Sequence, residues 1–241
     1  EYGKLPTGYQ QEIMDYSWGF TYGFRPILPQ IAEALFVRAA MLFTSDAFSL
    51  LFAGRLCSVL CGLVFAGYVR AIARKLFGRP AVQWLFTLLT VCLPQAAFLF
   101  TYLNCDSMAL MATAMIVWYL LRGMEDGFSV PTCLKLAVSF SICILSYYNA
   151  YGFLITGAVV FFGYYLEKNR RGEHCWKEFW KKGILILAVV LIRERIYSSG
   201  PSLKGRIQAQ ESHISRINAK NSISSHFSFV IFFICSLISF A

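Results

Sequence analysis

Long apolar runs separated by short polar junctions dominate the chain. Residues 47–68, 81–100 and 108–121 are each almost entirely apolar and approach the roughly 20 residues that a helix needs to cross a bilayer. We therefore predict three membrane-spanning helices. The apolar run 134–165 is too long for one helix and is interrupted by the sequence YYNAYG at 147–152. This pattern predicts two helices that meet at a tight turn.

The flanking segments have different patterns. Residues 29–44 are apolar but contain Glu33 and Arg38, which is typical of an amphipathic helix that lies in the membrane interface. The tail, 183–241, begins with only half a span of apolar residues, becomes polar and rich in serine, and ends in a short apolar stretch. We interpret this tail as a truncated or frame-disrupted product, or alternatively as a genuine loop.

Composition supports an all-α, multi-pass transmembrane helical bundle. The chain is 57% hydrophobic and 15% charged, whereas soluble proteins contain about 25% charged residues. This share of charged residues is too small to cover a protein surface that faces water. The net charge of +9 does not require nucleic acid as a partner, because excess lysine and arginine mark the cytoplasmic loops of membrane proteins. The eight cysteines show neither a disulfide framework nor zinc-ligand spacing.

Basic residues alternate between successive junctions. Four lie in 70–79, two in 122–135 and six in 167–182, whereas the junctions 101–107 and 147–152 have none. By the positive-inside rule, the basic segments are predicted to face the cytoplasm. The junctions without basic residues and the N-terminal segment then lie together on the outer side, and that face is the expected place for a functional site.

This sidedness gives a predicted domain organisation. The segments are an extracytoplasmic loop with an interfacial helix (1–46), a transmembrane module (47–166), a basic cytoplasmic loop (167–182) and the tail (183–241). Because the first residue is Glu1 rather than Met, we expect the sequence to begin inside a longer reading frame. An earlier helix is then required to carry residues 1–46 across the membrane.

The junction YLNCDS at 102–107 carries the first candidate chemistry. Asp106 stands at the outer end of a predicted span. One interpretation is structural, because a carboxylate is favoured at a helix N-terminus and Asp106 or Ser107 can cap the helix. The other is functional, because an ionisable residue at membrane depth tends to bind a metal or a polar substrate. Asn104 adds an amide that can hydrogen-bond hydroxyl groups.

Two aromatic segments on the same predicted side carry further candidates. The sequence DYSW at 15–18 leads to YGFRP at 22–26. Arg25 follows a glycine and offers fixed donors that suit phosphate; alternatively it snorkels within an interfacial aromatic belt. The tyrosines of the turn at 147–152 either stack against sugar rings or belong to such a belt.

Taken together, these segments resemble the N-terminal membrane module of the GT-C glycosyltransferases, which take a sugar from a polyprenyl or dolichyl phosphate carrier. The likeness covers about residues 10–166. It is carried by the sequences WGFTYGFRPILPQ, AGRLCSVLCGLVFAGYVRAIARKLFG and LPQAAFLFTYLNCDSMAL and by the paired helices around YYNAYGFL. The first resembles the family's aromatic–Gly–x–Arg segment, the second its Arg-led helix, and the third its Pro-led helix end and outer Asn-x-Asp junction.

The resemblance implies a GT-C-like bundle that transfers a sugar from a polyprenyl-phosphate carrier to a glycan, lipid or protein acceptor, with inversion at the anomeric carbon. Asp106 matches the family's second acidic position and Arg25 its phosphate-side arginine. The family's first acid or Asp-Glu pair is not visible, and Asp15 is the only outer-loop aspartate before the interfacial segment. The expected site residues are Asp15 and Asp106 as catalytic acids, Tyr22, Arg25, Asn104, Tyr148 and Asn149 as substrate-binding residues, and Asp106 as a ligand of a divalent metal, Mg²⁺ or Mn²⁺.

Two other functions stay open at this point. A transporter fragment would place charged residues and broken helices along a pathway at mid-span, whereas Arg55 is the main charge inside a span. A non-catalytic membrane scaffold is the second alternative, because the family's first acid is not visible. The chain lacks a dibasic or retention signal, so we expect a bacterial cell membrane rather than the endoplasmic reticulum.

Overall fold

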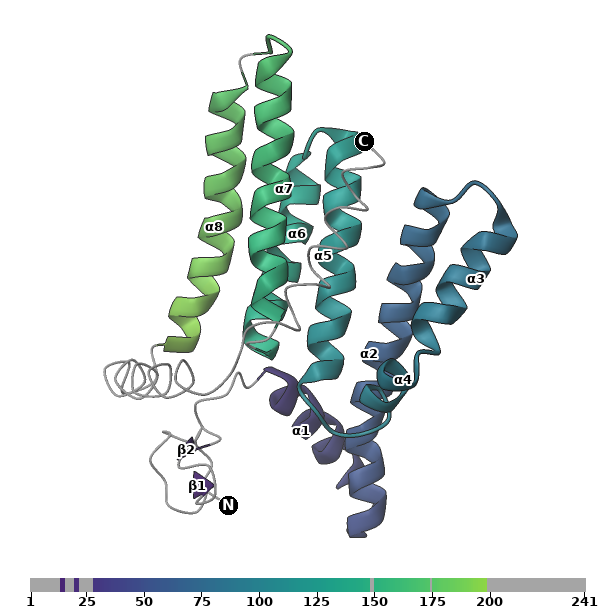
Figure 1. Ribbon diagram of the computed structural model, residues 1–241. Coiled ribbons are helices and arrows are strands. Elements are labelled where there is room, and N and C mark those ends of the chain that lie inside the picture. The colour runs from purple at the N-terminus through teal and green to yellow at the C-terminus, as the bar shows by residue number, and fades with distance from the viewer. Residues whose placement is uncertain (1–13, 16–19, 22–27, 148–149, 174, 199–241) are drawn as a thin grey trace. The chain divides into compact units, whose positions relative to one another are not determined.

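A computed structural model describes residues 14–15, 20–21, 28–147, 150–173 and 175–198 (Figure 1). The chain forms two compact units. One is Pro26–Val190, and the other combines Glu1–Arg25 with Leu191–Ala241. In the second unit, β1 (Met14–Asp15) pairs with β2 (Phe20–Thr21) in antiparallel orientation. All other described elements are helices, which confirms the predicted all-α class.

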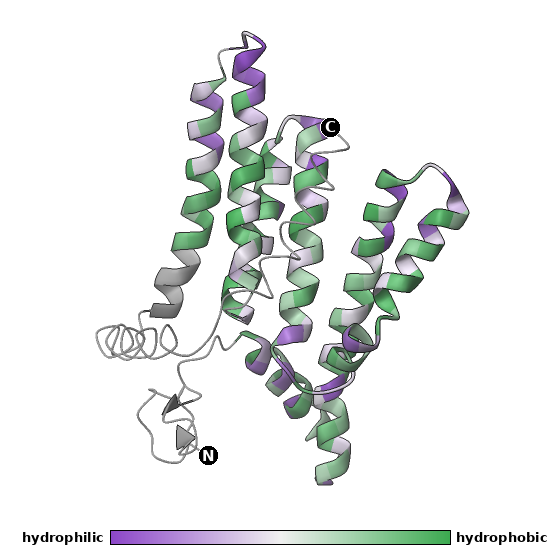
Figure 2. Ribbon diagram, viewed as in Figure 1, coloured by the Kyte–Doolittle hydropathy of each residue, from purple (hydrophilic) through white to green (hydrophobic). Residues whose placement is uncertain are grey.

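Eight helices follow along the described chain. They are α1 (Leu28–Ala40), α2 (Ala47–Leu76), α3 (Pro80–Val91), α4 (Pro94–Leu99), α5 (Asp106–Asp126), α6 (Val130–Ser146), α7 (Tyr151–Arg170) and α8 (Trp176–Ser198). By length and composition, α2 and α5 can cross a membrane, and α3 and α6 are shorter apolar helices. Figure 2 shows hydrophobic residues along the helices and hydrophilic ones mainly towards their ends.

The helix ends follow local signals in the sequence. Asp46 caps α2 by accepting a hydrogen bond from the Ser49 N–H at 2.9 Å. Proline opens α3 and α4 and occupies the first turn of α6, where its missing N–H costs nothing. Gly127 ends α5 with a φ of 69°, a left-handed conformation that glycine adopts without strain. The predicted helix within 29–44, the start of α2 and the two-helix interpretation of 134–165 agree with these elements, while the interfacial location of α1 stays a prediction.

The predicted span 81–100 is broken in the structure. α3 ends at Val91, and α4 starts at Pro94, because Leu93 has a non-helical backbone with a ψ of 127°. Proline lacks an N–H and disfavours helical geometry in the residue before it. The apolar pattern alone therefore predicted one helix over 81–100, whereas Pro94 divides this segment into α3 and α4.

The basic segment and the tail also differ from their predictions. Within 167–182, which was predicted as a loop, α7 continues to Arg170 and α8 already begins at Trp176. The apolar residues 183–192 are not an isolated half-span, because they lie inside the 23-residue α8. Side-chain contacts explain the continuity: Phe179 packs against Phe161 with ring centroids 5.6 Å apart, so the polar first turns of α8 are anchored to α7.

Helix α5 is the centre of the unit Pro26–Val190. It packs against α2 on one side and against α6 and α7 on the other. A buried cluster that includes Ile116, Leu136 and Phe161 lies between α5, α6 and α7. A second cluster, which includes Phe65 and Phe100, lies between α2, α4 and α5. The hydroxyl groups of Tyr68 and Tyr119, 2.9 Å apart, add a polar link between α2 and α5.

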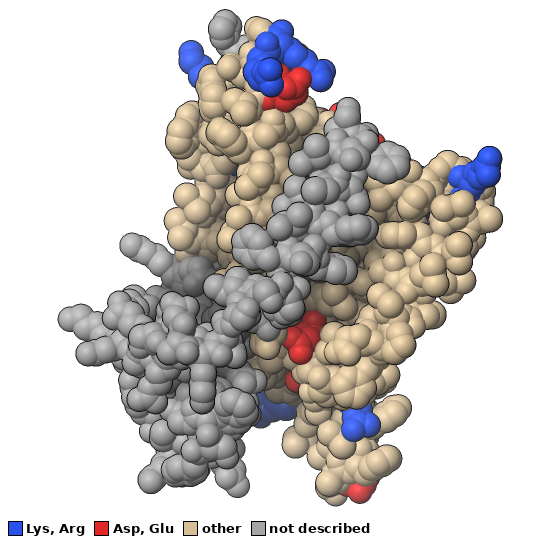
Figure 3. Space-filling view, viewed as in Figure 1, with Lys and Arg blue, Asp and Glu red and all other residues tan. Residues whose placement is uncertain are grey.

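The helix connections gather at two ends of this unit. The α2–α3, α5–α6 and α7–α8 connections lie at one end, which we call the basic end, and α1, the α4–α5 connection and the α6–α7 turn lie at the other, which we call the junction end (Figure 1). Figure 3 shows lysine and arginine gathered over the tips of the α7–α8 hairpin and the α2–α3 connection. The basic junctions of the sequence thus lie at one end of the unit, although Figure 3 also shows Lys or Arg towards the junction end. The assignment of the ends to sides of the membrane stays a prediction.

We predict that Gly62→Ala destabilises the protein whereas Gly67→Ala does not. A Cβ at position 62 would lie 2.8 Å from Phe100 Cγ and 3.1 Å from its Cβ, whereas nothing lies within 4 Å of a Cβ at position 67. Overpacking a core typically costs about 1–3 kcal/mol, while alanine is favoured over glycine in a helix by about 1 kcal/mol. The thermal unfolding midpoint in detergent should fall for the first variant and stay level or rise for the second. Equal midpoints would contradict the close packing of α2 on α4.

Candidate functional site

The connection between α4 and α5 is held together by Asn104. Its Nδ2 donates hydrogen bonds to the Leu99 carbonyl at 2.6 Å and to the Tyr102 carbonyl at 2.8 Å. Its Oδ1 accepts a hydrogen bond from the Ser107 N–H at 2.7 Å, which satisfies a backbone donor in the first turn of α5. The amide therefore shapes the junction, and its predicted contact with a substrate hydroxyl stays a prediction.

Helix α1 reaches the same junction through two polar side chains. Glu33 Oε1 accepts a hydrogen bond from the Asn104 N–H at 3.2 Å. Gln30 Nε2 donates to Cys105 Sγ at 3.1 Å. Because Gln30 and Glu33 are three residues apart, they lie on one face of the helix. Helix α1 is thereby fixed against the start of α5.

Glu33 is the residue at this end that sequence reasoning missed. Its side chain is half-buried, and burial raises the pKa of the carboxyl, while the hydrogen bond from the Asn104 backbone acts in the opposite direction. In the sequence, Glu33 merely interrupts an apolar stretch, as a solvent-facing residue of an amphipathic helix would. The one available signal was its spacing from Gln30, which placed two polar residues on a common face.

Asp46, a second carboxylate near this end, differs from Glu33 in its exposure and in the direction in which its pKa is shifted. It is exposed, and hydrogen bonds from the backbone and side chain of Ser49 hold its pKa below the usual range. These contacts stabilise the charged form at the start of α2. Asp46 is therefore a structural cap, whereas burial works against the charged form of Glu33.

Asp106 is the first residue of α5 and is half-buried. Its place in the first turn suits a carboxylate, because the helix dipole is positive there. The neighbouring Ser107 is buried, and its hydroxyl lies 3.4 Å from that of Ser58 on α2. Helices α1, α2 and α5 thus meet at the position where the sequence predicted the functional site.

The remaining predicted residues are only partly placed. Asp15 lies in β1, of which the backbone alone is described. Tyr22, Arg25, Tyr148 and Asn149 lie outside the described residues. Among the residues that the structure describes, no group of three or more His, Cys, Asp or Glu side chains is arranged to hold a metal ion. The described donor set therefore does not form a complete metal site, and a metal at Asp106 stays a prediction.

Comparison with known protein families identifies the relationship. The profile of the dolichyl-phosphate-mannose-protein mannosyltransferase family matches residues 32–197, from the first turns of α1 to the end of α8. The chain belongs to this mannosyltransferase family. A search of curated proteins and a search of solved structures each give no match.

Membership of the mannosyltransferase family confirms the resemblance and the fold class. The family belongs to the GT-C group and consists of multi-pass membrane glycosyltransferases, so the protein is a multi-pass integral membrane protein. The match also corrects the extent of the likeness, which the sequence analysis ended near residue 166. The match runs from residue 32 to residue 197, so α8 belongs to the family region together with Glu33, Asn104 and Asp106. Residues 10–31, with Asp15, Tyr22 and Arg25, lie outside the matched region.

We predict that Asn104→Ala destabilises the protein by about 1–3 kcal/mol. The variant leaves the carbonyl groups of Leu99 and Tyr102 and the Ser107 N–H without their partner, and an unsatisfied buried group costs about this much. Thr101→Ala is the matched control in the same junction, because it removes one exposed hydrogen bond to the Phe98 carbonyl. Thermal unfolding in detergent should show a clear fall for Asn104→Ala alone. Equal shifts would show that Asn104 does not hold the junction.

Proposed function

We propose that this protein transfers mannose from a polyprenyl-phosphate carrier to an acceptor hydroxyl on the extracytoplasmic face of the membrane. The observation that carries the proposal is the match to the mannosyltransferase family over residues 32–197. The reaction site is the junction end, where α1, α2 and α5 meet around Asn104. The acceptor is a glycan, lipid or protein, and we place the enzyme in a bacterial cell membrane.

The position of α1 suits a substrate that arrives from the membrane. Leu35 is 64% exposed, and Leu42 and Phe43, just beyond the end of the helix, are 81% and 90% exposed. These apolar side chains have to be covered by lipid in a membrane protein, whereas Glu33 faces the junction. A lipid carrier in the adjacent leaflet would bring its phosphate and sugar to the depth of this helix.

The chemistry requires a group that accepts a proton. The acceptor oxygen forms a bond to the anomeric carbon as the bond from that carbon to the phosphate oxygen breaks, and the acceptor proton moves to a general base. Glu33 suits this role because burial raises the pKa of its carboxyl, and a general base works best when its pKa approaches the working pH. Its carboxylate already contacts the junction, because Oε1 accepts a hydrogen bond from the Asn104 N–H at 3.2 Å.

Asp106 supplies a second carboxylate at the start of α5, and we propose that it orients hydroxyl groups of the sugar. The roles of Arg25 with the departing phosphate, of Tyr22, Tyr148 and Asn149 with the substrate, and of Asp15 as an acid stay predictions from the sequence resemblance. We derive no step through a metal, because the described side chains do not form a metal site.

We predict that Glu33→Gln lowers transfer by at least about 100-fold, the scale of general-base catalysis, without lowering stability at neutral pH. Burial raises the pKa of Glu33 above the ordinary value of 4.5. Its contribution to folding is therefore fully present below about pH 4.5 and is lost as the pH rises through the raised pKa. Glutamine avoids that loss and keeps an acceptor for the Asn104 N–H. Transfer from labelled polyprenyl-phosphate mannose and thermal unfolding should be measured on the same full-length protein.

Asp46→Asn is the matched control for this experiment. It replaces another carboxylate near the junction end, but one that only caps α2, so transfer should persist while the unfolding midpoint falls. If Glu33→Gln retains full transfer, the assignment of Glu33 is wrong. If the unmodified protein transfers no mannose from the carrier to any glycan, lipid or protein acceptor, the proposed function itself is wrong.

A further inference from the structure

The α7–α8 hairpin at the basic end has an excess of positive charge that the proposed reaction does not use. Residues 167–182 contain six lysine and arginine residues and three glutamates. Arg170 and Arg171, where α7 ends, are 78% and 73% exposed. Lys177 and Lys181, in the first turns of α8, are also exposed. Because they are four residues apart, these two lysines lie on one side of the helix.

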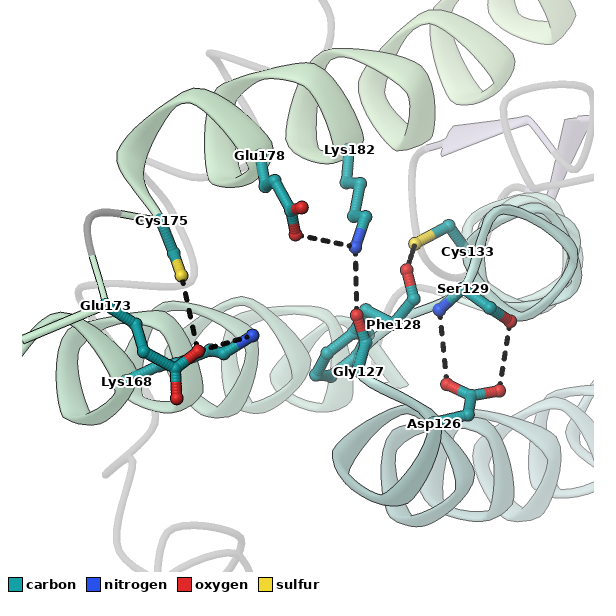
Figure 4. A network of polar contacts seen from close by, with 10 residues as sticks. All are labelled: Asp126, Gly127, Phe128, Ser129, Cys133, Lys168, Glu173, Cys175, Glu178 and Lys182. Carbon is teal, nitrogen blue, oxygen red and sulfur yellow. Dashed lines mark hydrogen bonds and ion pairs between the residues drawn. The ribbon is translucent and has the colours of Figure 1, made fainter. Parts of the chain in front are cut away.

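The three glutamates of the hairpin already have partners. Glu173 pairs with Lys168 at 3.0 Å and Glu178 with Lys182 at 3.2 Å (Figure 4). Glu167 pairs with Arg171 at 3.2 Å. Neither Lys177 nor Lys181 forms an ion pair with a described residue. The acidic residues therefore neutralise charges within the hairpin and leave these two lysines for an external anion.

Contacts inside the hairpin fix which side of α8 faces outward. Phe179 packs between the rings of Phe162 and Tyr165 on α7, with centroid distances of 5.8 and 5.7 Å. Lys182 Nζ donates a hydrogen bond to the Gly127 carbonyl at 2.9 Å, in the α5–α6 connection (Figure 4). These two residues mark the inner face of the helix.

The side of α8 opposite this inner face carries an apolar stripe that begins at Trp180, which is 63% exposed. Trp176 is 38% exposed, but its ring also packs against Phe162 of α7, with ring centroids 6.2 Å apart. Ile184 and Leu187 follow at helical spacing and are 58% and 56% exposed. In a membrane protein, such a stripe contacts acyl chains, and tryptophan is enriched where the chains meet the head groups. The two exposed lysines lie beside the tryptophans in the sequence, at the end of the stripe.

We propose that the tip of the α7–α8 hairpin binds the head groups of anionic phospholipids. The surface consists of Arg170, Arg171, Trp176, Lys177, Trp180 and Lys181. The lysines contact the head-group phosphates, and the tryptophans lie at the boundary between head groups and acyl chains. A bilayer lipid is favoured over a soluble phosphate because the basic tip is continuous with the apolar stripe through Ile184 and Leu187. This proposal depends on the membrane location and not on the proposed transfer reaction.

The test measures which lipids stay bound to the full-length protein. The protein is placed in nanodiscs that contain equal amounts of phosphatidylglycerol and phosphatidylcholine, and the retained lipids are identified by native mass spectrometry. The unmodified protein should retain phosphatidylglycerol preferentially. Lys177→Gln with Lys181→Gln should reduce that preference by about fivefold for each charge removed, since a basic residue near an anionic surface contributes on this scale.

Arg122→Gln with Lys135→Gln provides the charge-matched control. Both positions are exposed, and both were assigned by sequence to a basic segment, but neither lies on the hairpin. This variant should keep the lipid preference, and both double variants should keep the unfolding midpoint, because only exposed residues change. The proposal is overturned if the two double variants lose the preference equally or if the hairpin variant keeps it. Displacement of the lipid by millimolar glycerol phosphate would equally overturn it, since it would show a site for soluble phosphate.

Discussion

A backbone amide inside a bilayer has no water to bond with, so every N–H and C=O at membrane depth has to find a partner within the protein. Within a helix, these groups bond to one another. At a helix end, the terminal N–H and C=O groups need partners from elsewhere in the protein. At the break after α3, the last helical hydrogen bond is donated by the Cys92 N–H to the Leu88 carbonyl at 2.8 Å. The α4–α5 junction shows a second solution, in which one asparagine side chain bonds two carbonyl groups and one N–H.

The same requirement concentrates chemistry at the junctions. Hydroxyl groups within the helices are mostly satisfied by their own backbone, as Ser139 and Ser146 are by the carbonyl groups of Lys135 and Ile142. Side chains of that kind have little capacity left for a ligand. At the junction end, by contrast, polar groups from α1, α2 and α5 meet around the start of α5. The place where the backbone needs partners is thus also the place where polar side chains become available to a substrate.

The sequence predicts the helices of this protein better than their interruptions. Apolar runs identified the cores of α2, α5, α6 and α7, because hydrophobic length is a direct consequence of bilayer thickness. The break at Pro94 was misjudged since the residues around it are equally apolar. The start of α8 was missed for the opposite reason: its first turns are charged, and their helical structure depends on the packing of Phe179 against α7, which a local pattern does not reveal.

The sequence placed the candidate site at the junction around Asn104, from the contrast with its basic neighbours, and this location stays a prediction. The family match includes the junction. Glu33 was overlooked because its burial arises from α1 lying against a segment about 70 residues later in the chain, as the Asn104 contact shows. A contact of such sequence separation follows from the tertiary fold alone.

The burial of Glu33 and its hydrogen bond from the Asn104 N–H favour a functional role for this carboxyl group. A carboxylate contributes to stability when donors or cations surround its charged form, as Ser49 does for Asp46. Glu33 has one donor among the described residues, and its burial disfavours the charge. A glutamine would make the same hydrogen bond without that cost. Residues that oppose stability locally are concentrated at functional sites, and an ionisable group beside the membrane fits that description. The unfavourable electrostatics of Glu33 therefore favour it, more than the better stabilised Asp46, as the group that exchanges a proton with a substrate.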